Sequence, residues 1–323
     1  MYVLNQEQKL ISQIKNLVDT GGRFIGDDCA VLPGNLLLTT DALVEQTHFR
    51  LDSISLNDLS WKAIAVNLSD IAAMAGIPEY ALVTLSAPAD FYASNKVLSL
   101  YEGLHSCAQH YQTNIVGGDI TRGTNLVIVI TILGRAHQSG VLRRCGAKAG
   151  DIVLVTGDFG ASAAGLRLLE GNAYCPFKHC LDKHRRPQPR LKESHQLVER
   201  TGSRGALMDT SDGLADALAQ IAAASNVGMQ IDLAAVPIHA DTRAFASQAN
   251  LDPYELALYG GEDYELVACL PAQTWQDWHK QAPDTASSFI QIGIVDDTNN
   301  IQLMFGNGTA HQLDLQKVFQ HIA

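Results

Sequence analysis

The chain has 323 residues, of which 46% are hydrophobic and 18% are charged, and its formal net charge is −11. This composition is typical of a globular protein and argues against disorder, and the length favours two domains. The acidic balance disfavours nonspecific binding to nucleic acid or to a membrane surface. No apolar run is long enough to span a bilayer and no signal pattern opens the chain, so we expect a cytoplasmic protein.

Strands and helices alternate through the first part of the chain. Residues 5–18 carry apolar side chains at helical spacing and predict an amphipathic helix. Residues 56–75 are apolar nearly all round and predict a buried helix. The other elements expected before residue 135 are a helix at 93–110 and strands at 35–40, 80–86, 115–116 and 126–133.

A second alternating set follows a polar connector around residues 139–150. We expect helices at 161–169, 191–199 and 212–224, and strands at 152–156, 206–208, 229–233, 264–270 and 290–295. Two alternating sets predict an α/β or α+β protein with two domains, at residues 1–137 and 148–323.

Seven aspartates stand in short clusters with Gly, Ser and Thr beside apolar stretches: Asp27, Asp28, Asp41, Asp70, Asp119, Asp209 and Asp212. An isolated carboxylate is costly to bury, and crowded carboxylates ionise readily only when cations neutralise them. Hard oxygen ligands of this kind suit Mg²⁺, which completes its coordination with water and substrate phosphates. The pattern therefore favours a Mg²⁺-dependent enzyme that uses a nucleotide.

Each cluster taken alone also has an ordinary structural interpretation. Gly26-Asp27-Asp28 is compatible with a surface turn, and Asp70 with a helix carboxylate satisfied by Ser69 or the backbone. Ser211 or Asp212 is compatible with a helix N-cap, although the same helix start can hold a phosphate. The sequence Gly260-Gly261-Glu262-Asp263 repeats the pattern and is compatible with a solvated turn. The conjunction of the clusters is what favours a common site.

Candidate phosphate contacts are few. Asp119 follows Gly117-Gly118, whose bare backbone permits amide groups to approach a phosphate, and neither a P-loop nor a dinucleotide fingerprint is present. Arg143 or Arg144 could clamp a phosphate or simply solvate the connector, and His48 could contact a substrate or be structural.

The cysteines are too scattered for a disulfide framework. One segment, with Cys175, His179, Cys180 and His184, contains zinc-ligand residue types, but its spacing fits no common zinc finger. We favour a solvated connector over a zinc site there.

Taken in order, these motifs resemble those of the thiamine-monophosphate kinase family, within the superfamily that includes aminoimidazole ribonucleotide synthetase. The resemblance covers nearly the whole chain. In the first part it rests on Gly-Asp-Asp-Cys-Ala (26–30), Thr-Thr-Asp-Ala-Leu-Val (39–44), His-Phe (48–49), Lys-Ala-Ile-Ala-Val-Asn-Leu-Ser-Asp-Ile-Ala-Ala-Met (62–74) and Gly-Gly-Asp (117–119). In the second part it rests on Arg144 with Gly-Ala-Lys (146–148), Asp-Thr-Ser-Asp-Gly-Leu (209–214) and Gly-Gly-Glu-Asp-Tyr-Glu-Leu (260–266).

The resemblance implies direct in-line phosphorylation of thiamine monophosphate to thiamine diphosphate by ATP, with several Mg²⁺ ions and no catalytic base. It implies a homodimer in which the N-terminal mixed α/β domains pair into a barrel, each followed by a C-terminal α/β domain. The residues to which it assigns metal are Asp28, Thr39, Thr40, Asp41, Asp70, Asp119, Asp209 and Asp212. It assigns ATP contacts to Gly117, Gly118, Arg144 and Ser211, and substrate contacts to His48, Glu262 and Phe319.

Other activities remain alternatives. A purine-biosynthetic or hydrogenase-maturation relative would share the fold, but the maturation relative uses a C-terminal cysteine and this chain ends in His-Ile-Ala. A selenium-activating relative would need a reactive cysteine or selenocysteine, which residues 1–22 lack. A metal-dependent phosphohydrolase and a noncatalytic divalent-metal binding protein are the alternatives from other classes.

Overall fold

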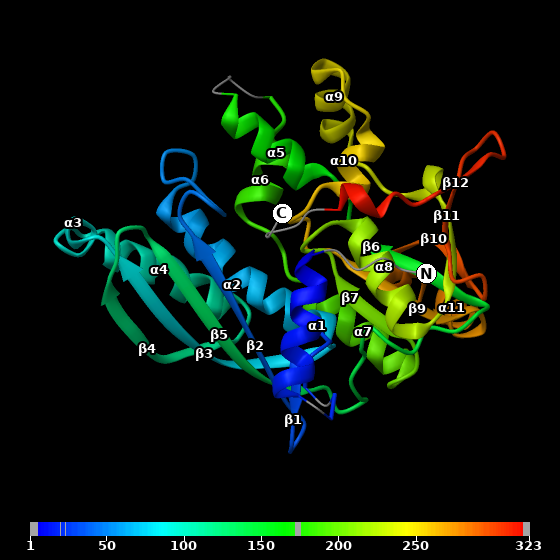
Figure 1. Ribbon diagram of the computed structural model, residues 1–323, viewed down its shortest axis with the longest axis horizontal. Helices are drawn as coiled ribbons and strands as arrows, with labels where there is room; N and C mark the ends of the chain where they lie inside the picture. The colour runs from blue at the N-terminus through cyan, green and yellow to red at the C-terminus, as the bar shows by residue number, and fades with distance from the viewer. Residues whose placement is uncertain (1–5, 20, 23, 172–175, 319–323) are drawn as a thin grey trace.

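The structure is a computed structural model, and it describes residues 6–19, 21–22, 24–171 and 176–318. It contains two mixed sheets, one in residues 30–136 and one in residues 151–312 (Figure 1). The expected mixed α/β architecture is confirmed. The limits 1–137 and 148–323 stay a prediction, although the connector between the two sheets falls between residues 136 and 151.

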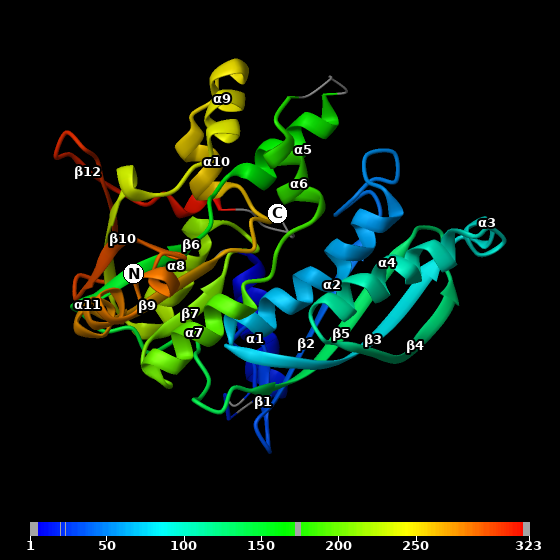
Figure 2. The ribbon, with the colours of Figure 1, turned by 180° about the vertical axis from the view of Figure 1, so that it is seen from behind.

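The first sheet has the strand order β1-β2-β5-β3-β4. Its strands are β1 (Ala30–Leu32), β2 (Leu36–Val44), β3 (Gly76–Ala87), β4 (Asn114–Arg122) and β5 (Val127–Ala136). Only β3 and β4 pair in parallel among them. The helices α2 (Leu56–Ala73) and α4 (Lys96–His110) cover one face, and Figure 2 shows them in front of the sheet. The short α3 (Ala89–Tyr92) links β3 to α4.

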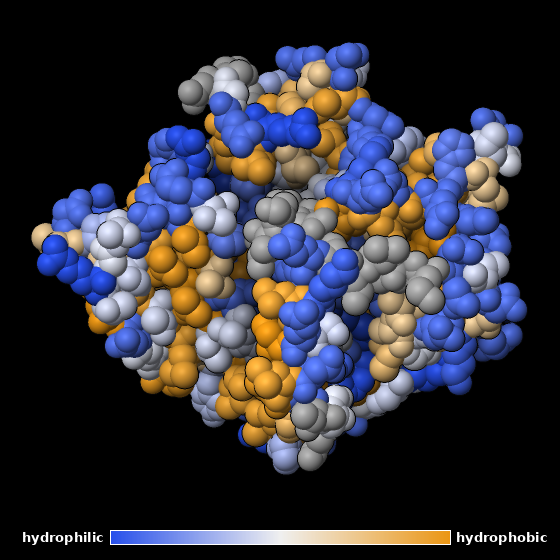
Figure 3. All heavy atoms as spheres, in the orientation of Figure 1, coloured by the Kyte–Doolittle hydropathy of each residue, from blue (hydrophilic) through white to orange (hydrophobic). Residues whose placement is uncertain are grey.

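The other face of this sheet is open in the chain. Apolar side chains stand exposed on it, including Leu38, Ile77, Tyr80 and Leu82. Figure 3 shows hydrophobic atoms over the same region, where Figure 1 places β2, β3 and β5. A large exposed apolar patch of this kind is typical of an interaction surface.

The second sheet has the order β12-β11-β8-β10-β6-β9-β7. Its strands are β6 (Asp151–Thr156), β7 (Ala206–Asp209), β8 (Gly228–Asp232), β9 (Leu266–Pro271), β10 (Phe289–Asp296), β11 (Ile301–Met304) and β12 (Ala310–Gln312). Helices cover both faces of this sheet, as the packing of strand β6 shows. Its side chains are buried without a gap, with Val153 and Val155 packing toward α8 (Leu214–Ser225), and Ile152 and Leu154 toward α7 (Leu191–Thr201) and α11 (Ala272–Gln281).

The remaining helices stand mostly at one end of this sheet (Figure 1). They are α5 (Ala161–Glu170), α6 (Lys178–Arg185), α9 (Ala240–Ala249), α10 (Pro253–Tyr259) and the short α12 (Pro283–Ala286), with single 3₁₀ turns at Leu233–Ala235 and Leu315–Lys317. Near the N-terminus, α1 (Gln6–Val18) confirms the expected amphipathic helix, but its apolar residues Leu10, Ile11, Ile14, Leu17 and Val18 are exposed. No helix in the described ranges is long and apolar enough to cross a membrane.

Three local expectations were wrong. The segment with His179, Cys180 and His184 was expected to be a solvated connector, but it lies in α6, where Cys180 and His184 are buried. Gly117 and Gly118 were expected after a strand ending at residue 116, but they lie inside β4, which runs to Arg122. The strand expected at 264–270 begins at Leu266, because Glu262 and Tyr264 have φ angles of 64° and 51° and cannot belong to an extended strand.

Candidate functional site

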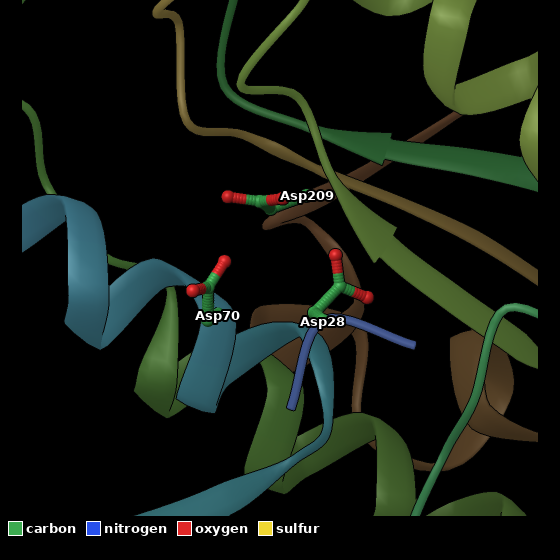
Figure 4. A group of neighbouring side chains, drawn as sticks. All are labelled: Asp28, Asp70 and Asp209. Carbon is green, nitrogen blue, oxygen red and sulfur yellow. The ribbon is translucent and has the colours of Figure 1, made fainter. Parts of the chain in front are cut away.

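Three carboxylates converge between the two sheets. Asp28 precedes β1, Asp70 lies in the last turns of α2, and Asp209 ends β7. Carboxylate oxygens of all three lie within 4.8 Å of one another. Figure 4 shows their side chains grouped around a common space. Residues from both parts of the chain therefore build a single acidic centre.

Two hydroxyl groups fix the orientation of this centre. Thr39 Oγ1 on β2 donates to Asp70 Oδ2, and Ser69 Oγ on α2 donates to Asp209 Oδ2, each at 2.5 Å. Helix α2 thus contributes the carboxylate of Asp70 to the centre, and its Ser69 hydroxyl donates to Asp209 of the neighbouring domain. The side chain of Ser69 is fully buried, so this bond is shielded from competing water.

The crowding of acids changes their protonation. Burial, followed by the charges of Asp41 and Asp209, raises the pKa of Asp70 well above its usual range. Burial and the neighbouring Asp28 raise the pKa of Asp209 to about 8. A bound divalent cation would reverse these shifts, because it stabilises the ionised forms.

Arg144 supplies a positive charge to this centre. Its guanidinium donates to both oxygens of Asp28, at 2.7 and 3.3 Å, and also to Gln220 on α8. Asp27 beside it accepts from the backbone N–H of Arg144 at 3.1 Å and pairs with Arg143. The connector between the two domains is therefore tied to the loop that carries Asp28.

The remaining predicted residues around the centre differ in where their side chains lie. The Asn67 side chain on α2 accepts from the backbone N–H of Asp41, and Asp41 is close enough to raise the pKa of Asp70. Thr40 points to the other side of β2, where its hydroxyl donates to Ile130 O and lies 3.0 Å from Thr131 Oγ1. Ser211 and Asp212 lie in the loop between β7 and α8.

Gly117, Gly118 and Asp119 lie apart from the centre within one chain. Asp119 is in register with Thr84, Thr84 with Val129, and Val129 with Ala42. Three strand spacings therefore separate Asp119 from β2, about 14 Å at the usual spacing. Thr84 alternates with the buried Val83 and Leu85, so Asp119 stands on the open face of the sheet, away from α2.

Gly118 also has a structural role. A Cβ atom there would lie 1.8 Å from Val83 O, and its φ of 155° is unfavourable for other residues. A Cβ at Gly117 would instead make an ordinary contact with Leu82, at 3.4 Å. Close pairing of β3 with β4 is thus sufficient to explain Gly118.

A second polar cluster surrounds Glu262. Lys62 Nζ lies 2.9 Å from its Oε1, and His184 Nδ1 lies 3.3 Å from its Oε2. His48 is near enough to be among the charges that lower the pKa of Glu262. The structure thus places the predicted substrate residues His48 and Glu262 near each other, whereas Phe319 lies outside the described residues.

Sequence reasoning missed Lys62 and His184 as members of this cluster. The signal for Lys62 was present, because a lysine in a helix that is apolar nearly all round must find a buried partner. His184 had been grouped with a possible zinc segment. In the structure His184 contacts Ser162 and Glu262, whereas His179 pairs with Asp158 at 2.9 Å, so the two histidines have different partners. Cys175 of that segment is not among the described residues.

Comparison with known proteins identifies the family. A model of the AIR synthase related protein N-terminal domain matches residues 26–136, and one of the corresponding C-terminal domain matches residues 148–306. The chain is 34% identical over 316 residues to thiamine-monophosphate kinase from Bacillus subtilis (strain 168), covering 94% of both chains. The chain belongs to the thiamine-monophosphate kinase family. It is therefore an enzyme of the kinase class.

Further similar proteins agree with this result. The thiamine-monophosphate kinase of Escherichia coli (strain K12) is 37% identical over 258 residues, with 76% of each chain covered. A solved structure described as AaThiL complexed with AMPPCP and TMP has 31% identity and a TM-score of 0.81, covering 97% of this chain and 99% of that one. The hydrogenase maturation protein HypE in complex with ATP, at 19% identity and a TM-score of 0.72, shares the fold.

Proposed function

We propose that this enzyme transfers the terminal phosphoryl group of ATP to the phosphate of thiamine monophosphate, forming thiamine diphosphate and ADP. Membership in the thiamine-monophosphate kinase family supports this activity, as does the similarity to AaThiL, which is described with AMPPCP and TMP. The observation that carries the proposal is the convergence of Asp28, Asp70 and Asp209 from two domains. Two polyanionic substrates can meet only where their charge is neutralised.

The donor set of this centre fits Mg²⁺. All its side-chain ligand atoms are oxygens, and burial has pushed the pKa of Asp209 to a value at which an added cation would release a proton. Asp28, Asp70 and Asp209 would hold the ions, with Asp41 and the Thr39 hydroxyl beside them, and Thr40, Asp119 and Asp212 complete the proposed set. Bound there, Mg²⁺ would neutralise phosphate charge.

The residues of the chain itself position the reactants. The acceptor is already a phosphate oxyanion, so we assign no general base and no phosphoenzyme, and we propose direct in-line transfer. Arg144 and Ser211, with Gly117 and Gly118, are the proposed ATP contacts. His48 and Glu262 are the proposed contacts to thiamine monophosphate, as is Phe319 outside the described residues. Because ATP is a substrate, we place the reaction in the cytoplasm.

We further propose that the active enzyme is a homodimer. The open apolar face of the first sheet supports pairing, and Asp119 stands on that face rather than at the acidic centre of its own chain. In a dimer through this face, Asp119 and the glycines before it would reach the centre of a second copy. The predicted barrel of paired sheets would also cover the exposed Leu38, Ile77, Tyr80 and Leu82.

The direct test is a coupled assay on the purified chain. With ATP and Mg²⁺, ADP should form only when thiamine monophosphate is added, and thiamine diphosphate should appear in equal amount. ADP formed without an acceptor would favour a phosphohydrolase instead, and metal binding without turnover would favour a noncatalytic protein. The Asp41→Asn variant should fold normally and lose activity, since it removes one carboxylate at the metal centre.

A further inference from the structure

Lys62 is a buried cation whose hydrogen-bonding capacity is not met by the described residues. The residue is 0% exposed, and its ammonium lies at ion-pair distance from Glu262. No hydrogen bond of acceptable geometry to Nζ is formed within the described part of the chain. An ammonium group has three donors, and burying it is costly unless those donors are used. The burial of Lys62 therefore indicates a role beyond packing.

The partner of Lys62 is held from both domains. Lys62 belongs to α2 of the first domain, and His184 belongs to α6 of the second. Glu262 itself adopts a φ of 64°, and its backbone N–H donates to Ser211 O at 2.6 Å. Non-glycine residues in this conformation are strained and occur where the surroundings fix them, often at functional sites. The side chain of Glu262 remains 26% exposed, so part of the carboxylate is accessible.

Helix α2 links the Lys62–Glu262 pair to the acidic centre, because it carries both Lys62 and Asp70. Lys62 and Asp70 are eight residues apart on one face of the helix, which corresponds to about 12 Å along its axis. An extended thiamine monophosphate places its pyrimidine ring at the far end from its phosphate, with the thiazolium ring between them. With the phosphate at the acidic centre, the pyrimidine end is the part that extends toward Glu262.

The charge of the cluster distinguishes two possible roles of Glu262. A carboxylate that balanced the thiazolium charge would need to keep its own charge uncompensated. Lys62 already neutralises it at 2.9 Å, so the pair offers an oriented acceptor with little net charge. Such an acceptor suits a neutral group that carries N–H donors.

We propose that Lys62, together with His184, positions Glu262 to accept a hydrogen bond from the amino group of the thiamine pyrimidine ring, and so determines substrate specificity. This rests on the proposed function. Lys62 is a positioning residue: it acts through Glu262 and touches neither phosphate. Its contribution should appear in the recognition of one substrate and not in the transfer step.

The test compares thiamine monophosphate with the analogue whose pyrimidine amino group is replaced by oxygen. Wild-type enzyme should prefer the amino compound by at least about tenfold in kcat/KM, because the analogue has no donor for the carboxylate. Lys62→Met should raise the KM for thiamine monophosphate by about tenfold, leave the KM for ATP unchanged, and remove most of the preference. Lys62→Arg should restore much of it, since the charge is kept.

Lys183→Met is the matched control. Lys183 is a buried lysine that pairs with Glu265, in the same loop as Glu262 but in a different ion pair. Its loss should lower the melting temperature and leave the preference for the amino compound intact.

Equal loss of preference in both variants, an unchanged preference in Lys62→Met, or no preference in the wild type would overturn the proposal. If Lys62→Met does not fold, Lys62→Gln and Lys62→Arg are compared in its place, and an unchanged preference in both overturns it. A wild-type enzyme that makes no thiamine diphosphate would overturn the proposed function itself.

Discussion

Ser69 of α2 donates its hydroxyl hydrogen to Oδ2 of Asp209 at the end of β7, at 2.5 Å. This buried bond joins the two domains at the acidic centre. The next residue along the helix, Asp70, belongs to that centre, so one turn of α2 supplies both a carboxylate and the group that orients its neighbour. The position of α2 therefore determines whether the carboxylates meet.

Replacing Ser69 by Ala should weaken this arrangement. We expect a loss of about 1–2 kcal/mol in the free energy of unfolding, because Asp209 loses a buried donor. We also expect the variant to need more Mg²⁺ for half-maximal turnover. Ser60→Ala is the control, since Ser60 is equally buried on α2 but donates to Leu56 O and Leu100 O. Urea unfolding and Mg²⁺ titrations of turnover would contradict the account if both variants shifted the Mg²⁺ requirement equally.

The two glycines of β4 should respond differently to alanine. Gly118→Ala should destabilise the protein by more than about 3 kcal/mol or prevent folding, because its Cβ would overlap Val83 O. Gly117→Ala should fold nearly normally, so a rise in its KM for ATP would report on nucleotide binding. Thermal melts and ATP kinetics check both. A stable Gly118→Ala protein would show that this strand pairing is wrong.

Glu265 should make the fold sensitive to strong acid. It is completely buried, and although burial opposes ionisation, Lys183 and Arg190 lower its pKa to about 2. A pKa that is lower in the folded state stabilises the fold above the unfolded value, about 4.3. That stability is lost as the pH falls from there toward 2.

Glu265→Gln should remove this dependence. At neutral pH the variant should be about 3–5 kcal/mol less stable, because the buried Lys183 and the partly buried Arg190 lose their partner. Its stability should also change less than that of the wild type between pH 5 and pH 2. Glu255→Gln, which affects an exposed pair with Lys317, should change stability by less than about 1 kcal/mol. Parallel pH profiles for the wild type and Glu265→Gln would refute the role given to this pair.

A charge on the open sheet face should prevent dimerisation. Leu82 is 46% exposed on β3, so Leu82→Asp should fold as a chain yet be monomeric by light scattering, with activity strongly reduced. Leu98→Asp on α4 is the control, because Leu98 is 67% exposed on the helical side of the sheet and should leave the dimer intact. A monomeric wild type with full activity would contradict the proposed dimer.

The local pattern of apolar residues in the sequence was sufficient to predict much of the fold. The nearly all-apolar sequence of α2 identified a buried helix, and the apolar run at residues 152–156 identified strand β6. Helices α6, α9, α10 and α11 were not expected, because their polar residues obscure the apolar side that packs against the domain. Strand β4 was cut short in the prediction because two adjacent glycines usually indicate a turn.

The candidate site was likewise predicted from the sequence only in part. The motifs named Asp28, Asp70 and Asp209, and the structure brings these three together. The pairing of Lys62 with Glu262 joins residues 200 positions apart through a loop with unusual backbone angles, so no spacing in the sequence reveals it. The position of Asp119 depends on strand order, which the motif Gly-Gly-Asp does not encode.

Thermal unfolding with and without Mg²⁺ tests most directly whether carboxylates from both domains share a cation. We expect Mg²⁺ to raise the melting temperature of the wild type, and to raise it little or not at all for Asp70→Asn in the first domain or Asp209→Asn in the second. Without Mg²⁺, both variants should be at least as stable as the wild type, because each relieves carboxylate crowding. Equal Mg²⁺-induced shifts in all three proteins would contradict the shared centre.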